Sequence, residues 1–289
     1  MSSPSEHAAL QSGNNAVITG GANGIGLAAA AQFLQFGMNV VIADKDADQL
    51  QVATDTLRET ADENIVVESF LCDVSDTAQV SALQEFAAET LGDISVLMNN
   101  AGSGANPGKP WENNVAWEQL IDVNFGGVLH GVQAFVPHML EQAKPGLIIN
   151  TGSKQGITRP PGNSAYNLSK AAVISYTESL AYEFRQMADC TLTAHLLVPG
   201  FTYTGMIARF VADKPDAAWT SEQVVAFMLE RLTEGDFYIL CPDNDVTPEM
   251  DARRIQWYAD DLIKNRPALS RWHEDYEEEF AAFMSAPRP

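Results

Sequence analysis

The chain has 289 residues, 46% of them hydrophobic, which suits a single large globular domain with a sizeable core. It carries 17 Lys and Arg against 38 Asp and Glu, and this formal charge of −21 opposes nucleic acid and anionic membrane surfaces as partners. Only three cysteines occur, and there is no apolar run of about 18 residues, so we expect a soluble, cytoplasmic protein without disulfides or a membrane span.

The predicted elements begin with a strand, a glycine-rich turn and a helix. The run Ala16 to Thr19 is short and apolar, the stretch 27–36 is rich in alanine, and a second buried strand over 39–43 follows. Glycines between such a strand and helix permit a tight turn, close approach of the backbone to a pyrophosphate, and close packing of the helix. Unpaired N–H groups at the start of the helix favour phosphate binding. The expected cofactor contacts in this turn are Gly20, Asn23, Gly24, Ile25 and Gly26.

Asp44 closes the second strand, about twenty residues after the turn. A carboxylate at this position accepts hydrogen bonds from a ribose 2′-OH and repels a 2′-phosphate. Lys45 next to it offsets part of that repulsion, and Asn23 in the turn brings no positive charge. The sequence therefore favours NAD over NADP.

The alternation of helices and strands continues along the chain. Helices are expected over 46–60, 77–91, 115–141 and 163–187, and strands over 65–71, 94–98, 147–151, 191–198 and 237–240. This order predicts an α/β fold with a doubly wound parallel sheet, helices on both faces, and ligands beyond the carboxyl ends of the strands. We expect a flexible N-terminus over 1–13, one catalytic domain over 14–241, and a helical extension over 242–289.

Tyr166 and Lys170 lie four residues apart on a predicted helix, so their side chains point into the same space. An unperturbed Tyr holds its proton until about pH 10, which is too tight for a general base at neutral pH. A neighbouring cation favours the phenolate and lowers the pKa of the Tyr. The pair is a candidate acid/base for proton transfer.

Several motifs together resemble one family. They are Thr19-Gly20-x-x-x-Gly24-Ile25-Gly26, Asn99-Asn100-Ala101-Gly102, Asn124, Ser153, Tyr166-x-x-x-Lys170 and Pro199-Gly200. Their order and approximate spacing are similar to those of the classical short-chain dehydrogenases/reductases, over about residues 14–240. The resemblance implies a Rossmann-like fold and hydride transfer between a nicotinamide and a substrate alcohol.

The resemblance also implies a role for each matching residue. Tyr166 is the expected acid/base, Ser153 the group that holds the substrate oxygen, Lys170 the group that lowers the Tyr pKa and contacts the ribose, and Asn124 the support of a water chain. No metal site is expected. The family is commonly dimeric or tetrameric, so a homodimer or homotetramer is expected. Further cofactor contacts implied by the family are Asp73, Val74, Asn100, Ala101, Gly102, Pro199, Gly200, Thr202 and Thr204.

The segment 201–220 occupies the place of the family's substrate loop. Its apolar and aromatic residues line a substrate pocket or form the inner face of a short lid helix, with Pro107 and Trp111 on a possible opposite wall. The candidate pocket residues are Ser153, Phe201, Tyr203, Met206 and Phe210. Lys154, next to Ser153, points into this cleft or into solvent. The composition of the loop favours a hydrophobic small-molecule substrate.

The chain continues beyond the last predicted strand, from Pro242 to Pro289. Helices are expected over 248–264 and 270–284. In the second, four aromatic residues recur three or four apart and form one apolar stripe: Trp272, Tyr276, Phe280 and Phe283. This extension packs either on its own domain or on a neighbouring subunit.

The sequence thus favours an NAD-dependent oxidoreductase that interconverts a hydrophobic, aryl-bearing secondary alcohol and its ketone, with a steroid-like or alicyclic alcohol as a close alternative. An NADPH-dependent ketone, 3-oxoacyl or steroid reductase is a second hypothesis, which Asp44 disfavours. A catalytically silent NAD(H)-binding sensor is a third, and the joint presence of Ser153, Tyr166, Lys170 and Asn124 argues against it.

Overall fold

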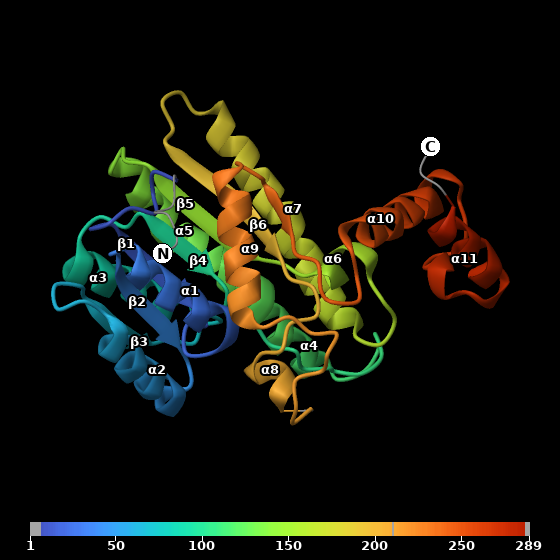
Figure 1. Ribbon diagram of the computed structural model, residues 1–289, viewed down its shortest axis with the longest axis horizontal. Helices are drawn as coiled ribbons and strands as arrows, with labels where there is room; N and C mark the ends of the chain where they lie inside the picture. The colour runs from blue at the N-terminus through green and yellow to red at the C-terminus, as the bar shows by residue number, and fades with distance from the viewer. Residues whose placement is uncertain (1–6, 210, 287–289) are drawn as a thin grey trace.

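The computed structural model describes residues 7–209 and 211–286, and its centre is a seven-stranded parallel sheet (Figure 1). The sheet order is β3-β2-β1-β4-β5-β6-β7, so the strand order reverses between β1 and β4. The predicted α/β fold with a doubly wound parallel sheet is confirmed. The strands are β1 Asn15–Thr19, β2 Asn39–Asp44, β3 Val67–Leu71, β4 Val96–Asn99, β5 Gly146–Thr151, β6 Leu192–Val198 and β7 Tyr238–Leu240.

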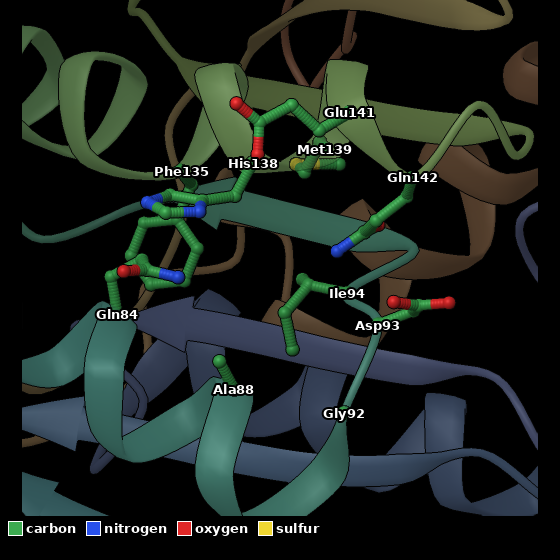
Figure 2. Close-up of a pocket in the computed structure, with 10 residues that line it drawn as sticks. All are labelled: Gln84, Ala88, Gly92, Asp93, Ile94, Phe135, His138, Met139, Glu141 and Gln142. Atoms are coloured by element: carbon green, nitrogen blue, oxygen red, sulfur yellow. The ribbon is translucent and has the colours of Figure 1, made fainter.

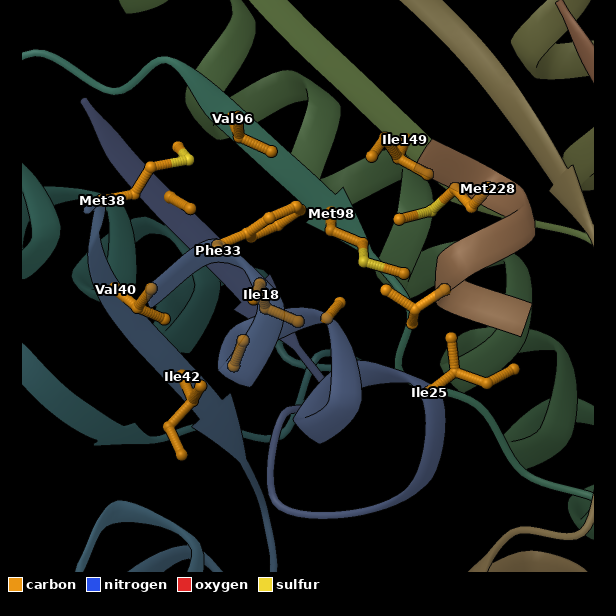
Figure 3. Packing of buried hydrophobic residues seen from close by; sticks show 14 of the residues in the cluster. Ile18, Ile25, Phe33, Met38, Val40, Ile42, Val96, Met98, Ile149 and Met228 are labelled. Carbon is orange, nitrogen blue, oxygen red and sulfur yellow. The ribbon is translucent and has the colours of Figure 1, made fainter. Parts of the chain in front are cut away.

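Helices cover both faces of the sheet because successive strand residues point to opposite sides. Ile18 of β1 belongs to the core cluster with α1 (Gly24–Gln35), α2 (Ala47–Thr60) and α9 (Ser221–Thr233). Its neighbour Val17 belongs to the cluster with α3 (Thr77–Leu91), α5 (Gly127–Glu141) and α7 (Ser164–Gln186). Figure 3 shows the first cluster, in which Phe33 of α1 lies among strand residues.

The long helix predicted over 115–141 is present but irregular. It consists of α4 (Asn114–Ile121), a π-helical segment over Asp122–Gly126, and α5. The segment buries Asn124 completely. Pro137 lies inside α5. π-helical turns inside α-helices occur frequently at functional sites.

Two parts of the fold differ from the expectations. A flexible N-terminus was expected over 1–13, of which 1–6 lie outside the described residues, whereas Ala9 and Leu10 are fully buried in the same cluster as Phe33. The backbone N–H of Gly13 donates to the Gly37 carbonyl at 2.8 Å, which attaches this stretch to the end of α1. Helix α9 was not predicted, although Thr220 and Gln223 form a capping box at its start.

The C-terminal extension contains α10 (Pro248–Ile263), two 3₁₀ turns over Ser270–Trp272 and Glu274–Tyr276, and α11 (Glu277–Ser285). The prediction of one helix over 270–284 is therefore wrong. His273 has an extended backbone and its Nδ1 accepts from Asp275 N at 3.2 Å, which interrupts the helix between the two turns.

The four aromatic residues consequently do not form one stripe. Phe280 and Phe283 pack on Trp257 of α10, with ring centroids 5.2 and 5.3 Å from its own, whereas Tyr276 packs edge-on against His273. In Figure 1, α10 and α11 project away from the sheet on the side of α6 (Lys154–Thr158). None of the helices formed by the described residues is long and apolar enough to cross a membrane.

Candidate active site

In the turn between β1 and α1, close packing leaves no room for a side chain at Gly20 or Gly26. Gly20 has a φ of +64°, and a Cβ there would lie 2.7 Å from the Cα of Ala101. A Cβ on Gly26 would lie 2.3 Å from the carbonyl oxygen of Gly20. The glycines therefore let the turn pack tightly in front of the start of α1, and a tight glycine turn before a helix is the arrangement that binds a pyrophosphate.

Asp44 lies at the end of β2 beside this turn. Its Oδ2 accepts from Ala22 N at 3.3 Å, and its Oδ1 accepts from Asp46 N at 3.1 Å. The side chain of Lys45 turns toward Asp73 after β3, with Nζ 3.8 Å from the carboxylate. Part of the positive charge next to Asp44 is thus offset by a second carboxylate.

The residues after β3 and β4 complete this edge of the sheet. Asn100 Nδ2 donates to the carbonyls of Thr19 and Gly20 at 3.2 and 3.1 Å, which holds the chain after β4 against the glycine turn. Hydrogen bonds from the hydroxyl and N–H of Ser75 lower the pKa of Asp73, although burial opposes them. Val74 is buried against α5, where a Cβ on Gly127 would meet it at 2.6 Å.

Tyr166 and Lys170 lie on the first turns of α7, as their spacing predicts. The Lys170 Nζ is 5.9 Å from the centroid of the Tyr166 ring and donates to the carbonyl oxygen of Thr151 at 2.8 Å. Lys170 is only 4% exposed, and burial lowers its pKa to about 8. The helix thus holds an ammonium group in the interior at the end of β5.

Ser153 stands opposite, where β5 ends and α6 begins. Its Oγ accepts from Gln155 N at 3.2 Å and caps the short helix. Burial raises the pKa of the Tyr166 phenol, and a hydrogen bond with Ser153 lowers it in part. This net direction is opposite to the one expected from the neighbouring ammonium, because burial outweighs the hydrogen bond with Ser153.

Asn124 lies behind these residues. Its Oδ1 accepts from Ser103 N at 2.7 Å, and its Nδ2 donates to Ser103 O at 3.0 Å and to Ser169 Oγ at 3.1 Å. The π-helical segment directs the Asn124 amide to the loop after β4 and to α7. A Cβ on Gly102 would lie 3.4 Å from Asn124 Oδ1 and 3.7 Å from Lys170 Nζ, so Asn124 and Lys170 face one space.

The segment after β6 closes over the glycine turn. Thr202 is buried, and its hydroxyl donates to the Gly200 carbonyl at 3.2 Å. Gly205 N, at the start of the short helix α8 (Gly205–Ala208), donates to Asn23 Oδ1 at 3.3 Å. A Cβ on Gly24 would meet Thr204 at 3.1 Å. The structure thus brings Asn23, Gly24 and Thr204 together.

The proposed substrate loop is only partly apolar toward the cleft. Met206 lies against Gly104 of the loop after β4, where a Cβ would be 2.7 Å from its Sδ. The Tyr203 hydroxyl donates to Ala212 O at 2.6 Å, and Phe201 is 39% exposed. Trp111, expected on the opposite wall, is 78% exposed. Phe210 lies outside the described residues.

Lys154 takes neither of the two expected positions. Its side chain is largely buried, and Nζ lies 2.6 Å from Asp251 and 3.6 Å from Asp243 of the C-terminal segment. Sequence reasoning did not find this cluster because its members are far apart in the chain. Ser103, Ser169 and Thr151, which contact Asn124 and Lys170, were also missed, although Ser169 lies within the Tyr-x-x-x-Lys motif.

A cavity of about 380 Å³ lies elsewhere, between α3 and α5 (Figure 2). It is lined by residues such as Gln84, Ile94 and His138, at the amino-terminal edge of the sheet, and contains none of the predicted site residues. Among the described residues, no three or more His, Cys, Asp or Glu side chains form a group that could hold a metal ion.

The site residues together fit a nicotinamide dinucleotide. The tight glycine turn before α1 suits a pyrophosphate, and Asp44 suits a ribose hydroxyl. When bound, the nicotinamide supplies the acceptor or donor of a hydride. The chain supplies a hydroxyl pair at Ser153 and Tyr166, which can hold an oxygen and exchange a proton with it, and an ammonium at Lys170.

Comparisons with known proteins agree with this geometry. The family model described as short chain dehydrogenase matches residues 14–215. The chain is 34% identical over 206 residues to 3beta-hydroxysteroid dehydrogenase 2 of Eggerthella lenta. The matched region covers 71% of this chain and 76% of that protein.

Two solved structures are also similar. A short chain dehydrogenase/reductase from Burkholderia phymatum in complex with NAD is 32% identical, with a TM-score of 0.77, covering 88% of this chain and 96% of that one. A metagenomic short-chain oxidoreductase in complex with NADP is 26% identical, with a TM-score of 0.66, covering 81% of this chain and 98% of that one.

Proposed function

The chain belongs to the classical short-chain dehydrogenase/reductase family and is an oxidoreductase that acts on alcohols, and from this premise we propose that it uses NAD to interconvert a hydrophobic secondary alcohol and its ketone. The carboxylate of Asp44 beside the glycine turn carries the choice of cofactor. A 2′-phosphate at that place would meet a negative charge, and Lys45 is engaged by Asp73 at 3.8 Å.

In the proposed reaction, the Tyr166 phenolate takes the hydroxyl proton of the alcohol in oxidation, and the Tyr166 phenol gives a proton to the ketone oxygen in reduction. Ser153 holds the same substrate oxygen. The hydrogen bond between Ser153 and Tyr166 supports this role, because it places the two hydroxyls side by side. Lys170 favours the phenolate by its charge, and Asn124 fixes the loop at Ser103 beside it. Because burial raises the pKa of Tyr166, oxidation of the alcohol requires the Lys170 ammonium to stabilise the phenolate.

The substrate class follows from the loop after β6 and from the relative that acts on a hydroxysteroid. Met206 and the exposed ring of Phe201 offer apolar contacts next to the site. We therefore expect a bulky alcohol with an aryl group or fused alicyclic rings. A homo-oligomer is expected for this enzyme, as for the family.

Initial rates of NADH and NADPH formation at 340 nm, over secondary alcohols graded from 2-propanol to 1-aryl alkanols and hydroxysteroids, test the proposal. We expect NAD-linked rates that rise with the bulk of the alcohol. Tyr166→Phe should lower kcat by about 10²-fold or more, with the Kd for NADH within about twofold of the wild-type value. An unchanged kcat in this variant would overturn the assigned acid/base.

Asp44→Ala tests the cofactor separately. Loss of a charged hydrogen-bonding group should lower the NAD-over-NADP ratio of kcat/KM by about tenfold or more. Asp48→Ala, at an exposed position in the first turn of α2, is the matched control and should leave the ratio unchanged. A ratio in Asp44→Ala equal to that in the control would refute the role of Asp44.

A further inference from the structure

The C-terminal extension attaches to the catalytic domain directly beside Ser153. Helix α6 begins at the next residue and packs against α10, as Figure 1 shows. The side chain of Lys154 is only 16% exposed, and its Nζ lies 2.6 Å from the Asp251 carboxylate of α10. At the other end of α6, the Arg159 guanidinium donates to the Tyr258 hydroxyl and lies over its ring. Both ends of α6 are thus bound to the extension.

The same lysine is also connected to the loop after β6. Lys154 N donates to the Pro199 carbonyl at 3.5 Å, and Lys154 Nζ lies 3.6 Å from the Asp243 carboxylate. Asp243 Oδ2 in turn accepts from Phe201 N at 3.2 Å, and its Oδ1 accepts from Val246 N at 2.8 Å. The Lys154 cluster, defined as Lys154, Asp243 and Asp251, therefore joins three segments: the one after Ser153, the one at Phe201, and the extension.

This cluster is electrostatically costly. The side chains of both carboxylates are 6% exposed, and Arg254 approaches Asp251 only to 4.0 Å. Burial raises the pKa of Asp251, although Lys154 and Arg254 oppose the shift. Buried ion pairs of this kind are weak contributors to stability, but removal of one partner alone is strongly destabilising. The cluster is thus better suited to fixing a geometry than to stabilising the fold.

We propose that Lys154 is a positioning residue of the substrate site, which holds the Ser153 segment and the Phe201 segment in a fixed relation and makes the C-terminal extension a structural part of that site. The Ser153 hydroxyl is set by the start of α6, and the backbone of Phe201 is set by Asp243, so displacement of the cluster moves both sides of the cleft. The inference rests on the proposed function only in taking these two segments to face the substrate.

The test uses a charge-neutral double variant of the full chain, Lys154→Met/Asp251→Asn. It removes one positive and one negative buried charge and leaves Asp243 bonded to its backbone N–H donors. The matched control is Lys144→Met/Asp93→Asn, which removes an exposed ion pair of 2.6 Å at the amino-terminal edge of the sheet. The conservative variant Lys154→Arg, with Asp251 intact, keeps the positive charge at this position and tests whether that charge is sufficient.

In the Lys154→Met/Asp251→Asn variant, kcat/KM for the best secondary alcohol should fall about tenfold, as expected for a misplaced substrate, while the Kd for NADH stays within about twofold. Amide hydrogen exchange over 153–158 and 199–209 should accelerate, and it should remain at the wild-type rate in α1 and in the control. Lys154→Arg should keep most of the wild-type kcat/KM.

A melting temperature that falls while kcat/KM and the exchange rates of both segments match those of the control would overturn the proposal, because the cluster would then be merely structural. Unchanged values in all three measurements would overturn it as well. If the wild-type protein turns over no alcohol in the panel, the proposed function fails, but hydrogen exchange with and without NADH still decides whether the cluster couples the two segments.

Discussion

Lys170 presents a direct conflict between stability and the proposed chemistry. It is 4% exposed, and the structure gives its ammonium a carbonyl oxygen, Thr151 O at 2.8 Å. Burial lowers its pKa from 10.5 to about 8. At about 1.4 kcal/mol for each tenfold change, this corresponds to ~3 kcal/mol of unfavourable free energy for the charged form in the folded state.

Lys170→Met should therefore abolish turnover without destabilising the protein at pH 7. The variant escapes the charging cost of ~3 kcal/mol but leaves Thr151 O without its donor, which costs about 1–3 kcal/mol. We therefore expect urea denaturation to give a free energy of unfolding for Lys170→Met that is equal to the wild-type value or higher by up to about 2 kcal/mol.

The pH dependence gives the sharper test. Because the folded-state pKa is depressed, the unfolded chain binds more protons between pH 8 and 10.5, so the stability of the wild type rises with pH in that window. Between pH 7 and 9.5 the wild type should gain about 2 kcal/mol relative to Lys170→Met. Lys144→Met, at an exposed position, should show no such trend. A constant difference between wild type and Lys170→Met across this range would refute the reasoning.

Two further variants test packing. Gly26→Ala should destabilise the protein by about 1–3 kcal/mol and weaken NADH binding by about tenfold or more, because its Cβ would lie 2.3 Å from the Gly20 carbonyl oxygen. The control Gly126→Ala, whose Cβ meets nothing closer than 3.7 Å, should retain the wild-type affinity for NADH. Equal NADH affinities of the two variants would contradict this account. Trp257→Ala removes a ring that is 2% exposed and packs against Phe280 and Phe283. It should lower the free energy of unfolding of the extension by about 3–5 kcal/mol and make 248–286 sensitive to proteolysis. Resistance to proteolysis equal to that of the wild type would contradict this packing.

The features that the sequence predicted well are those encoded locally. Tyr166 and Lys170 lie four residues apart on one helix, and the glycines of the turn lie between one strand and the next helix, so periodicity alone brings each group together. The order of strands and helices then sets the parallel sheet. Phe280 and Phe283 both pack on Trp257, but the interruption of the helix at His273, where the backbone is extended, was not indicated by their spacing.

The features that were missed depend on tertiary contacts. Lys154 and Asp251 are far apart in the sequence, and the residues around Lys154 give no local sign that it is buried. The direction of the Tyr166 pKa shift depends in the same way on burial, which the helix spacing does not reveal. In contrast, the capping box of α9 at Thr220 and Gln223 is readable from the sequence.

The two buried lysines have opposite relations to their surroundings, and this difference separates their roles. Among the described residues, no carboxylate pairs with Lys170, so its charge is kept at a cost and is available for the proposed stabilisation of a Tyr166 phenolate. Lys154 is shared between Asp243 and Asp251, so its charge is consumed by the contacts it makes. A group that must influence a proton needs an uncommitted charge, whereas a group that must hold two segments together needs a committed one.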